Sequence, residues 1–169
     1  MPMSAMSKLS VAALVLVLAG VATAQAQGVN GSITATAQVQ APITVTGTQN
    51  LSFGNVFPGV AKAVAYTDAT NAGTFSVGGQ ASTPVTYSFT LPANLTSAGN
   101  NLPIGSWLGY ANTTNSTSGG SAITPSATPA TATLSGSGGL FFFLGATVTP
   151  PANLPAGAYS GTVTLTVSY

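Results

Sequence analysis

The 169-residue sequence predicts an all-β protein, an antiparallel two-sheet β-sandwich of immunoglobulin-like or Greek-key type with about eight or nine short strands. The last eleven residues, YSGTVTLTVSY, place Ser or Thr at every even position and apolar residues or Gly between them, as in a strand with one buried face. After the N-terminal leader no segment keeps a helical period, and the 20 glycines and 11 prolines of the chain interrupt it often. We therefore expect no substantial helix there. A closed barrel is the less favoured all-β alternative.

The leader, residues 1–26, has the pattern of a secretory signal peptide. Lys8 precedes the apolar run LSVAALVLVLA, and small residues follow it, so cleavage is expected after Ala24 or Ala26. A membrane span needs about 20 apolar residues, and polar side chains follow this run too early. We predict export to the periplasm, the cell surface or the medium, with residues 27–169 as a single mature domain.

The first strand pattern after the leader is GSITATAQV. It places small and apolar side chains on one face, and Pro42 separates it from a second short strand, ITVTG. LSFGNV directs Leu51 and Phe53 inward. The next two patterns, TFSVGG and PVTYSFTLP, give the inward sets Phe75, Val77, Val85, Tyr87, Phe89 and Leu91.

The connections are rich in turn residues. TDATNAG and LTSAGNNLPIG are expected to be polar loops, and residues 112–130 form the longest low-complexity segment, expected to be a flexible loop. After it, TATLSGSGGLFFFLGATV predicts a hairpin around residues 135–139. The apolar run 140–144 is expected to be a strand buried on both faces or covered by a partner. The terminal strand then follows a Pro- and Gly-rich connection.

Charge is nearly absent from the expected mature chain, which carries only Lys62 and Asp68 as charged side chains and no His or Cys. Nucleic acids and anionic membranes require a basic patch, which this composition cannot supply. Catalysis by a Ser-His-Asp, Cys-His or paired-carboxylate arrangement would need residues that are missing. We therefore expect no enzyme activity, no metal and no cofactor. A neutral surface favours association over repulsion.

Two aromatic residues suggest an alternative function. Trp107 and Tyr110, in GSWLGYAN, could form a platform on which a sugar ring stacks. The alternative is thus an extracellular module that binds carbohydrate or another surface. We interpret Trp107 instead as a core residue of the sandwich, as one inward Trp often is.

The order of four segments resembles a known family. TATAQVQAPITVTG, LSFGNVFPG, VTYSFTLP and LPAGAYSGTVTLTVSY together resemble exported bacterial domains of the DUF4402 type and, more distantly, spore coat protein U and chaperone–usher pilin subunits. The distant resemblance implies an incomplete sandwich whose groove is filled by a partner's extended N-terminal segment. The chain departs from pilins in lacking a disulfide and in having its aromatic residue last rather than last but one.

These observations predict a non-catalytic exported structural or surface protein that self-associates or binds another exported subunit, such as a fimbria- or coat-like subunit. Two arrangements are open for the terminal strand. In the favoured one the sandwich is complete, and residues 33–39 of the same chain pair with this strand. In the other, that segment belongs to a neighbouring copy. Both arrangements involve the same residues, namely Ile33, Ala35, Ala37, Val39, Val163, Leu165, Val167 and Tyr169.

Overall fold

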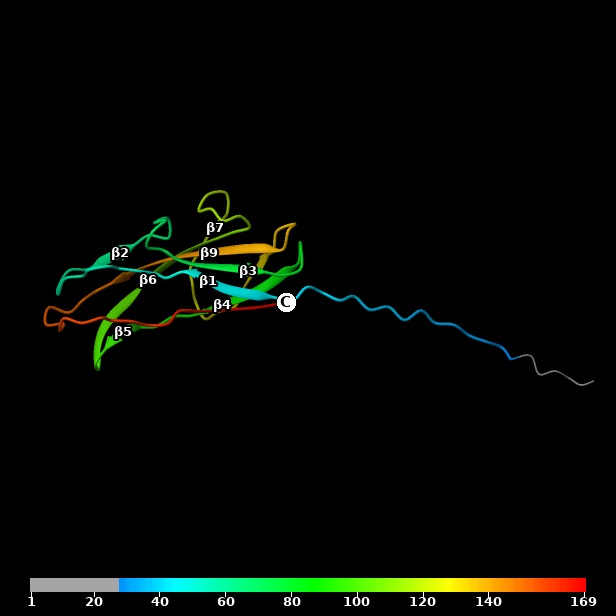
Figure 1. Cartoon of the computed structure of the whole chain (residues 1–169), viewed down its shortest axis with the longest axis horizontal. Helices are drawn as coiled ribbons and strands as arrows, with labels where there is room; N and C mark the ends of the chain where they lie inside the picture. The colour runs from blue at the N-terminus through cyan, green and yellow to red at the C-terminus, as the bar shows by residue number, and fades with distance from the viewer. Residues whose placement is uncertain (1–27) are drawn as a thin grey trace, which may run out of the picture. The chain divides into compact units, whose positions relative to one another are not determined.

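The computed structural model describes residues 28–169, and the predicted signal peptide lies outside these residues. Residues from Gln38 to Tyr169 form one compact unit. This unit is an antiparallel two-sheet sandwich of ten strands, which confirms the predicted fold class (Figure 1). No helix in the described part of the chain is long and apolar enough to cross a membrane.

The larger sheet has seven strands in the order β1-β3-β9-β6-β5, with β2 beside β9 and β7 beside β6. Its strands are β1 Thr44–Gln49, β2 Lys62–Val64, β3 Gly73–Gly78, β5 Asn94–Ser97, β6 Asn100–Asn112, β7 Ser121–Ile123 and β9 Gly139–Val148. β9 is central and buried on both faces, as the apolar run 140–144 predicted.

The smaller sheet has the order β10-β4-β8, so that β10 is one of its edges. Its strands are β4 Pro84–Thr90, β8 Ala130–Thr133 and β10 Thr164–Ser168. Alternation in β4 buries Val85, Tyr87 and Phe89, as predicted. The register of β10 places Leu165 opposite Phe89 in the interior.

The core lies between the two sheets and has two parts. The first part surrounds Phe142, which is fully buried and whose ring centroid lies 4.8 Å from that of Tyr87 and 5.6 Å from that of Phe89. The second part lies nearer the other end of β9 and consists of Phe53, Val64, Leu102, Ile104, Ala146 and Val148. Half-buried apolar side chains border both parts, and those around the second part include Leu51, Val56, Leu95, Trp107 and Tyr159.

Two predicted strands are not strands in the structure. Residues 33–39 have no secondary structure, and their side chains are exposed. Residues 51–56 also form no strand, because Gly54 takes a left-handed backbone conformation with φ of 56°. The inward direction of Phe53 was nevertheless predicted correctly, since it is 9% exposed.

A segment predicted to be a polar loop is a hairpin instead. β5 and β6 are joined by Ala98 and Gly99, whose φ angles of 45° and 84° give the left-handed pair that a tight two-residue hairpin turn requires. Pro103 and a bulge within β6 interrupt the alternation of this long strand. These interruptions hid it in the sequence.

The turn at residues 135–139 is present, but it does not close a hairpin. The Ser135 amide donates to the Gly139 carbonyl at 2.9 Å, while β8 before the turn pairs with β4 and β9 after it pairs with β3 and β6. The predicted hairpin is therefore wrong. The turn is a corner at which the chain passes from the smaller sheet to the larger one.

The low-complexity segment 112–130 contains β7 and a set of local hydrogen bonds. The amide of Asn112, which is 6% exposed, donates to the carbonyls of Ser116 and Ser118 at 2.8 and 2.9 Å. The Tyr110 hydroxyl accepts from the Gly120 amide at 2.6 Å. Side chains of β6 thus organise the part of this segment that was expected to be a flexible loop.

Asp68 organises the connection between β2 and β3. Its carboxylate accepts from the Asn71 side-chain amide at 2.9 Å and from the backbone amides of Thr70 and Asn71 at 3.0 Å each. These hydrogen bonds, above all the one from the Asn71 side chain, hold the pKa of Asp68 below its ordinary value of 3.8.

A lowered pKa in the folded state makes a pH-dependent contribution to stability. It is complete above pH 3.8 and is lost as the pH falls from there through the lowered pKa. We therefore expect the melting temperature of the wild type to fall between pH 6 and pH 2. The melting temperature of the Asp68→Asn variant should change less over the same pH range, because Asp68 carries the only side-chain carboxylate in the sequence. Equal acid sensitivity of both chains in thermal scans would contradict this role.

Candidate functional site: an apolar groove between two strand edges

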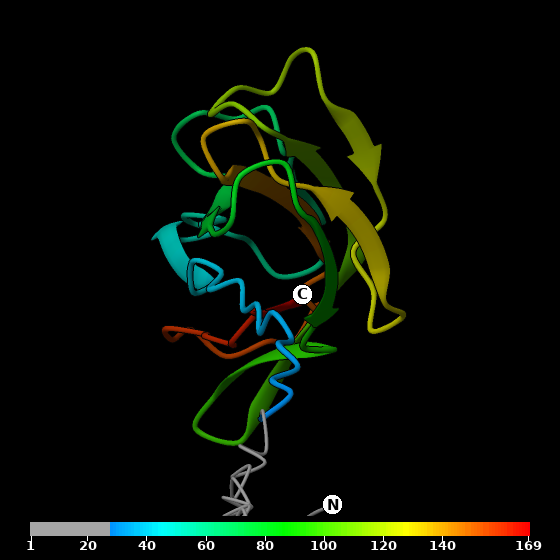
Figure 2. The same cartoon turned by 90° about the vertical axis from the view of Figure 1, so that its right-hand side faces the viewer.

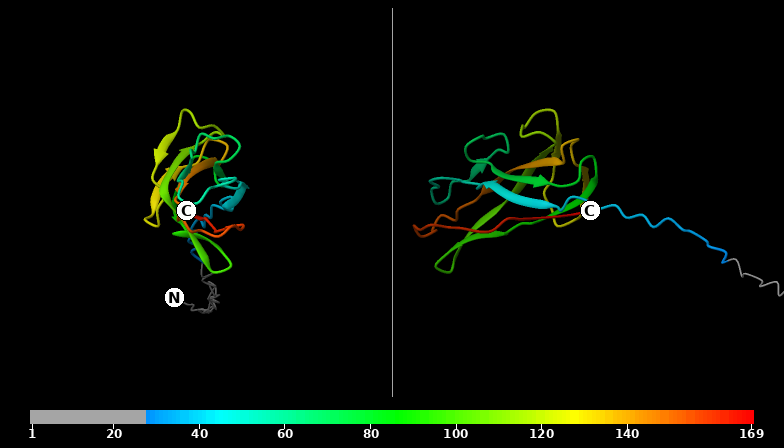
Figure 3. Two further views of the ribbon diagram at one scale, coloured as in Figure 1. Left: turned by 90° about the vertical axis from the view of Figure 1, so that its left-hand side faces the viewer. Right: turned by 45° about the vertical axis from the view of Figure 1, so that its right-hand side comes forward.

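An open groove of about 910 Å³ runs along one side of the sandwich. One wall is residues 47–56, which are the second half of β1 and the chain after it, and the other is residues 157–163, which lead into β10. Figures 2 and 3 show β1 in cyan and the C-terminal segment in red on the same side of the molecule. The groove therefore lies between the end of β1 with the chain that follows it, at an edge of the larger sheet, and the chain that leads into β10, at an edge of the smaller sheet.

Both walls have free backbone groups. Among residues 28–169, β1 pairs with β3 alone and β10 with β4 alone. Between backbone groups, the segment 157–163 is fixed by two hydrogen bonds between Ser160 and Thr96, at 2.8 and 3.1 Å. The segment 50–56 is fixed by one such bond, from the Ser52 amide to the Asn71 carbonyl at 2.9 Å. An extended chain placed between the walls could hydrogen-bond to both edges.

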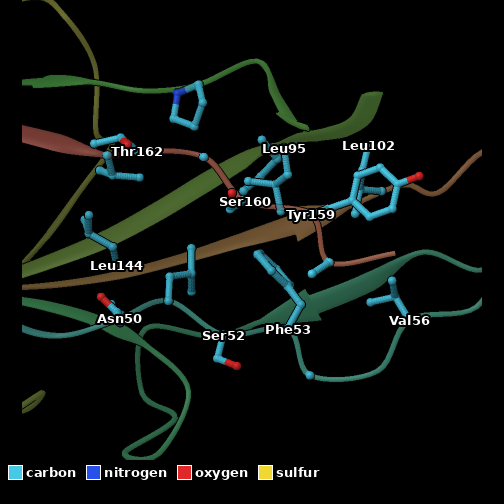
Figure 4. A pocket seen from close by; sticks show the side chains of 18 of the residues that line it. Asn50, Ser52, Phe53, Val56, Leu95, Leu102, Leu144, Tyr159, Ser160 and Thr162 are labelled. Atoms are coloured by element: carbon cyan, nitrogen blue, oxygen red, sulfur yellow. The ribbon is translucent and has the colours of Figure 1, made fainter. Parts of the chain in front are cut away.

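The lining of the groove is largely apolar. In Figure 4, Phe53 points into the pocket from one wall, and Leu95 and Tyr159 lie on the opposite side. The apolar lining residues packed on the second part of the core are Leu51, Phe53, Val56, Leu95, Leu102, Ile104, Trp107 and Tyr159. Several of them are only half-buried. The groove thus exposes one side of the core.

Trp107 reaches the groove because β6 contains a bulge. The pairing of β6 with β9 shifts between Gly105 and Leu108, and Ser106 in the bulge has a φ of 48°. One extra residue reverses the facing of every residue that follows it. Trp107 consequently points to the interior, where it packs on the second part of the core and lines the groove.

The predicted sugar platform is not formed. Trp107 faces the interior, whereas Tyr110 lies opposite Phe143 on the outer face of the larger sheet. The Tyr110 ring is 9% exposed and stacks on Tyr66, with centroids 5.4 Å apart and the rings 10° from parallel. Since the two aromatic residues lie on opposite faces, no single sugar ring can contact both.

Little charge is present near the groove. Lys62 donates from its Nζ to the Asn55 carbonyl at 3.1 Å, which fixes the chain beyond Phe53. Asp68 is engaged by its own loop. Within residues 28–169 no three His, Cys, Asp or Glu side chains gather in a group that could hold a metal. The groove is suited to hydrogen-bond with a backbone and to bury apolar side chains.

The residues that were predicted to exchange strands differ in their burial. Val163 lines the groove, Leu165 is buried in the core, and Val167 packs half-buried beside it. Tyr169 is 46% exposed. At the other end, Ile33 and Val39 are 96% and 93% exposed and Ala35 and Ala37 are exposed as well. Residues 33–39 form no strand, and β10 pairs with β4 alone within residues 28–169, so the favoured pairing of these residues with the terminal strand is not formed there.

Sequence reasoning missed much of the groove. Leu95 and Leu102 lie in a hairpin that was interpreted as a loop, and Trp107 was assigned to the general core. Gly99 offered one signal in the sequence, because a Gly between two short runs is typical of a hairpin turn, and the structure gives Ala98 and Gly99 the left-handed conformation of such a turn. The bulge at Ser106 left no signal in the sequence that we can identify.

Comparison with known proteins bears on the family. A family model described as a domain of unknown function, DUF4402, matches residues 31–169. The chain belongs to the DUF4402 family. The match confirms the resemblance to the DUF4402 family and covers the whole sandwich. A search of curated proteins found no match to this DUF4402 chain.

Proposed function

We propose that this DUF4402 protein is an exported, non-catalytic structural subunit that self-associates, with the groove of one copy filled by an extended segment of another. A fimbria- or coat-like role at the cell surface would use such a subunit. The observation that carries the proposal is the apolar groove between the chain that continues β1 and the chain that leads into β10, two strands that each have one partner within residues 28–169.

The chemistry of the groove supports a polypeptide as its occupant. Edge strands with unpaired backbone groups are templates for a further strand. An inserted strand would bury the half-exposed side chains of Leu51, Val56 and Tyr159, and burying one large apolar side chain stabilises a complex by about 1.5–3 kcal/mol. The mature chain carries one positive and one negative side chain, so copies would not repel one another.

Light scattering during size exclusion tests the proposal on the mature chain. We expect species larger than a monomer, increasing with concentration from micromolar upwards. A monomer at high micromolar concentration in several salts would overturn it.

A groove variant and a matched control locate the contact. Val163→Asp places a carboxylate where an inserted strand would desolvate it, and we expect association to weaken by at least about 100-fold. Thr164→Asp adds the same charge at the exposed neighbouring position, so association should be little changed. If Val163→Asp lowers the melting temperature, Val56→Asp, on the other wall of the groove, replaces it as the groove variant. Equal association of all these chains would place the contact elsewhere.

A further inference from the structure

The segment suited to this groove is present in the chain itself. In residues 29–39 every odd position is apolar or Gly, and every even position is Asn, Ser, Thr or Gln. Val29, Ile33 and Val39 are 96%, 96% and 93% exposed, and residues 28–40 take part in no strand. As a strand, eleven residues would extend about 36 Å and present one apolar face. The wall from 47 to 56 has ten residues and the wall from 157 to 163 has seven, so the segment is long enough to run along both.

A chain that filled its own groove would have to reverse direction between this segment and β1. The register of that hairpin is constrained by the side of β1 that faces inward. Val45 lies opposite the buried Val77, so odd-numbered residues at the start of β1 face the interior. Val39 can face the interior beside β1 only if it pairs with an odd-numbered residue of β1, for example Val45. This pairing leaves a loop of three residues, 41–43.

The three loop residues are unsuited to that turn. A three-residue hairpin loop is a type I turn followed by one left-handed residue. Pro42 would occupy the second central position of the turn, where it forces Ala41 out of the helical conformation that the turn needs. Ile43 would have to be left-handed, which a β-branched residue strongly disfavours. A five-residue loop would instead remove Thr44 from its pairing with Gly78.

A hydrogen-bonded clamp also holds the root of the segment. The Ala41 amide donates to the Gln80 side-chain carbonyl at 3.2 Å, and the Tyr169 hydroxyl donates to the Ala41 carbonyl. The Gln80 amide donates to the same hydroxyl at 2.7 Å. Both backbone groups of Ala41 are thus engaged by the last residue of the chain and by the connection after β3. A reversal at this point would break these bonds.

We propose that residues 29–39 fill the groove of a second copy, and that Pro42, Ile43 and the Tyr169 clamp prevent them from filling their own. This inference rests on the proposed function and names the partner at that groove. The donating segment and the accepting groove are different surfaces, so each copy can donate and accept at once. Such an interface joins copies head to tail, into rings or open chains.

Mixing two defective copies tests insertion between chains. Ile33→Asp/Val39→Asp has a groove but no apolar segment, and Val163→Asp has a segment but a blocked groove. Each should be a monomer with a cooperative melting transition, and the mixture should form a 1:1 dimer with no larger species. No complex between two folded variants would overturn the inference. Val56→Asp replaces Val163→Asp if the latter fails to fold.

A loop variant tests why insertion is between chains. Pro42→Asn/Ile43→Gly/Tyr169→Phe permits the three-residue turn and removes the hydroxyl of the clamp, so we expect a monomer whose amides 29–39 are protected from hydrogen exchange. The control Pro42→Asn/Ile43→Ala/Tyr169→Phe loses the same packing and the same hydroxyl but keeps a residue that disfavours the left-handed conformation, and it should associate like the wild type. Protection of these amides in a wild-type monomer, or unchanged association of the glycine variant, would overturn the inference.

A wild-type monomer with unprotected amides would instead overturn the proposed function itself. Association that survives loss of residues 28–40 would overturn only the choice of segment.

Discussion

A mature chain shortened to begin at Ala41 is expected to fold as a monomer with nearly the wild-type melting temperature and to lose self-association. Residues 28–40 contribute no strand to the sandwich, and their large apolar side chains are exposed, so their removal leaves the core intact. The Ala41 backbone contacts with Gln80 and Tyr169 remain available. Circular dichroism and light scattering measure the two properties separately.

A synthetic peptide of residues 28–40 should bind this shortened chain and raise its melting temperature. The peptide Ile33→Asp/Val39→Asp is the matched control. Burial of each of the two apolar side chains that this control lacks contributes about 1.5 kcal/mol or more to binding, so we expect its affinity to be at least about 100-fold weaker. Titration calorimetry gives both affinities. If the shortened chain unfolds and the peptide does not restore it, residues 28–40 belong to the chain's own fold, as a self-complete sandwich would require.

Phe142→Ala is expected to lower the free energy of unfolding by about 3–5 kcal/mol. Phe142 has no exposed surface and lies at the centre of the first part of the core, against Tyr87 and Phe89 of the smaller sheet. Truncation leaves a cavity between the two sheets that β9, paired on both sides, cannot collapse to fill. Chemical denaturation measured by fluorescence or circular dichroism gives the change.

Phe57→Ala is the matched control for this change. The Phe57 side chain is 69% exposed, so its truncation should alter stability by less than about 0.5 kcal/mol. The large difference between the two variants follows from burial alone, since the chemical change is the same. Similar losses for both would mean that Phe142 does not hold the two sheets together as the structure indicates.

The sequence alone determined the fold class and several strands, because alternation with a period of two is a local property. β4 shows this clearly: Val85, Tyr87 and Phe89 alternate with polar residues, and all three are buried. The apolar run within β9 likewise predicted a strand buried on both faces. Part of the groove lining could be predicted in the same way, since Leu51 and Phe53 were predicted to face inward and Val163 to lie on an apolar face.

Only the tertiary structure decided which strands pair and where the groove lies. The alternation of residues 33–39 shows that a strand could form, but strand formation requires an edge with free backbone groups, and the choice of edge depends on contacts far away in the sequence. Sequence reasoning placed these residues beside the terminal strand, whereas β10 pairs only with β4 within residues 28–169. The turn at 135–139 gave no sign that it joins two sheets rather than two paired strands. A bulge at Ser106 turned Trp107 inward, because inserting one residue reverses every later side chain, and this insertion is defined only by the partner strand.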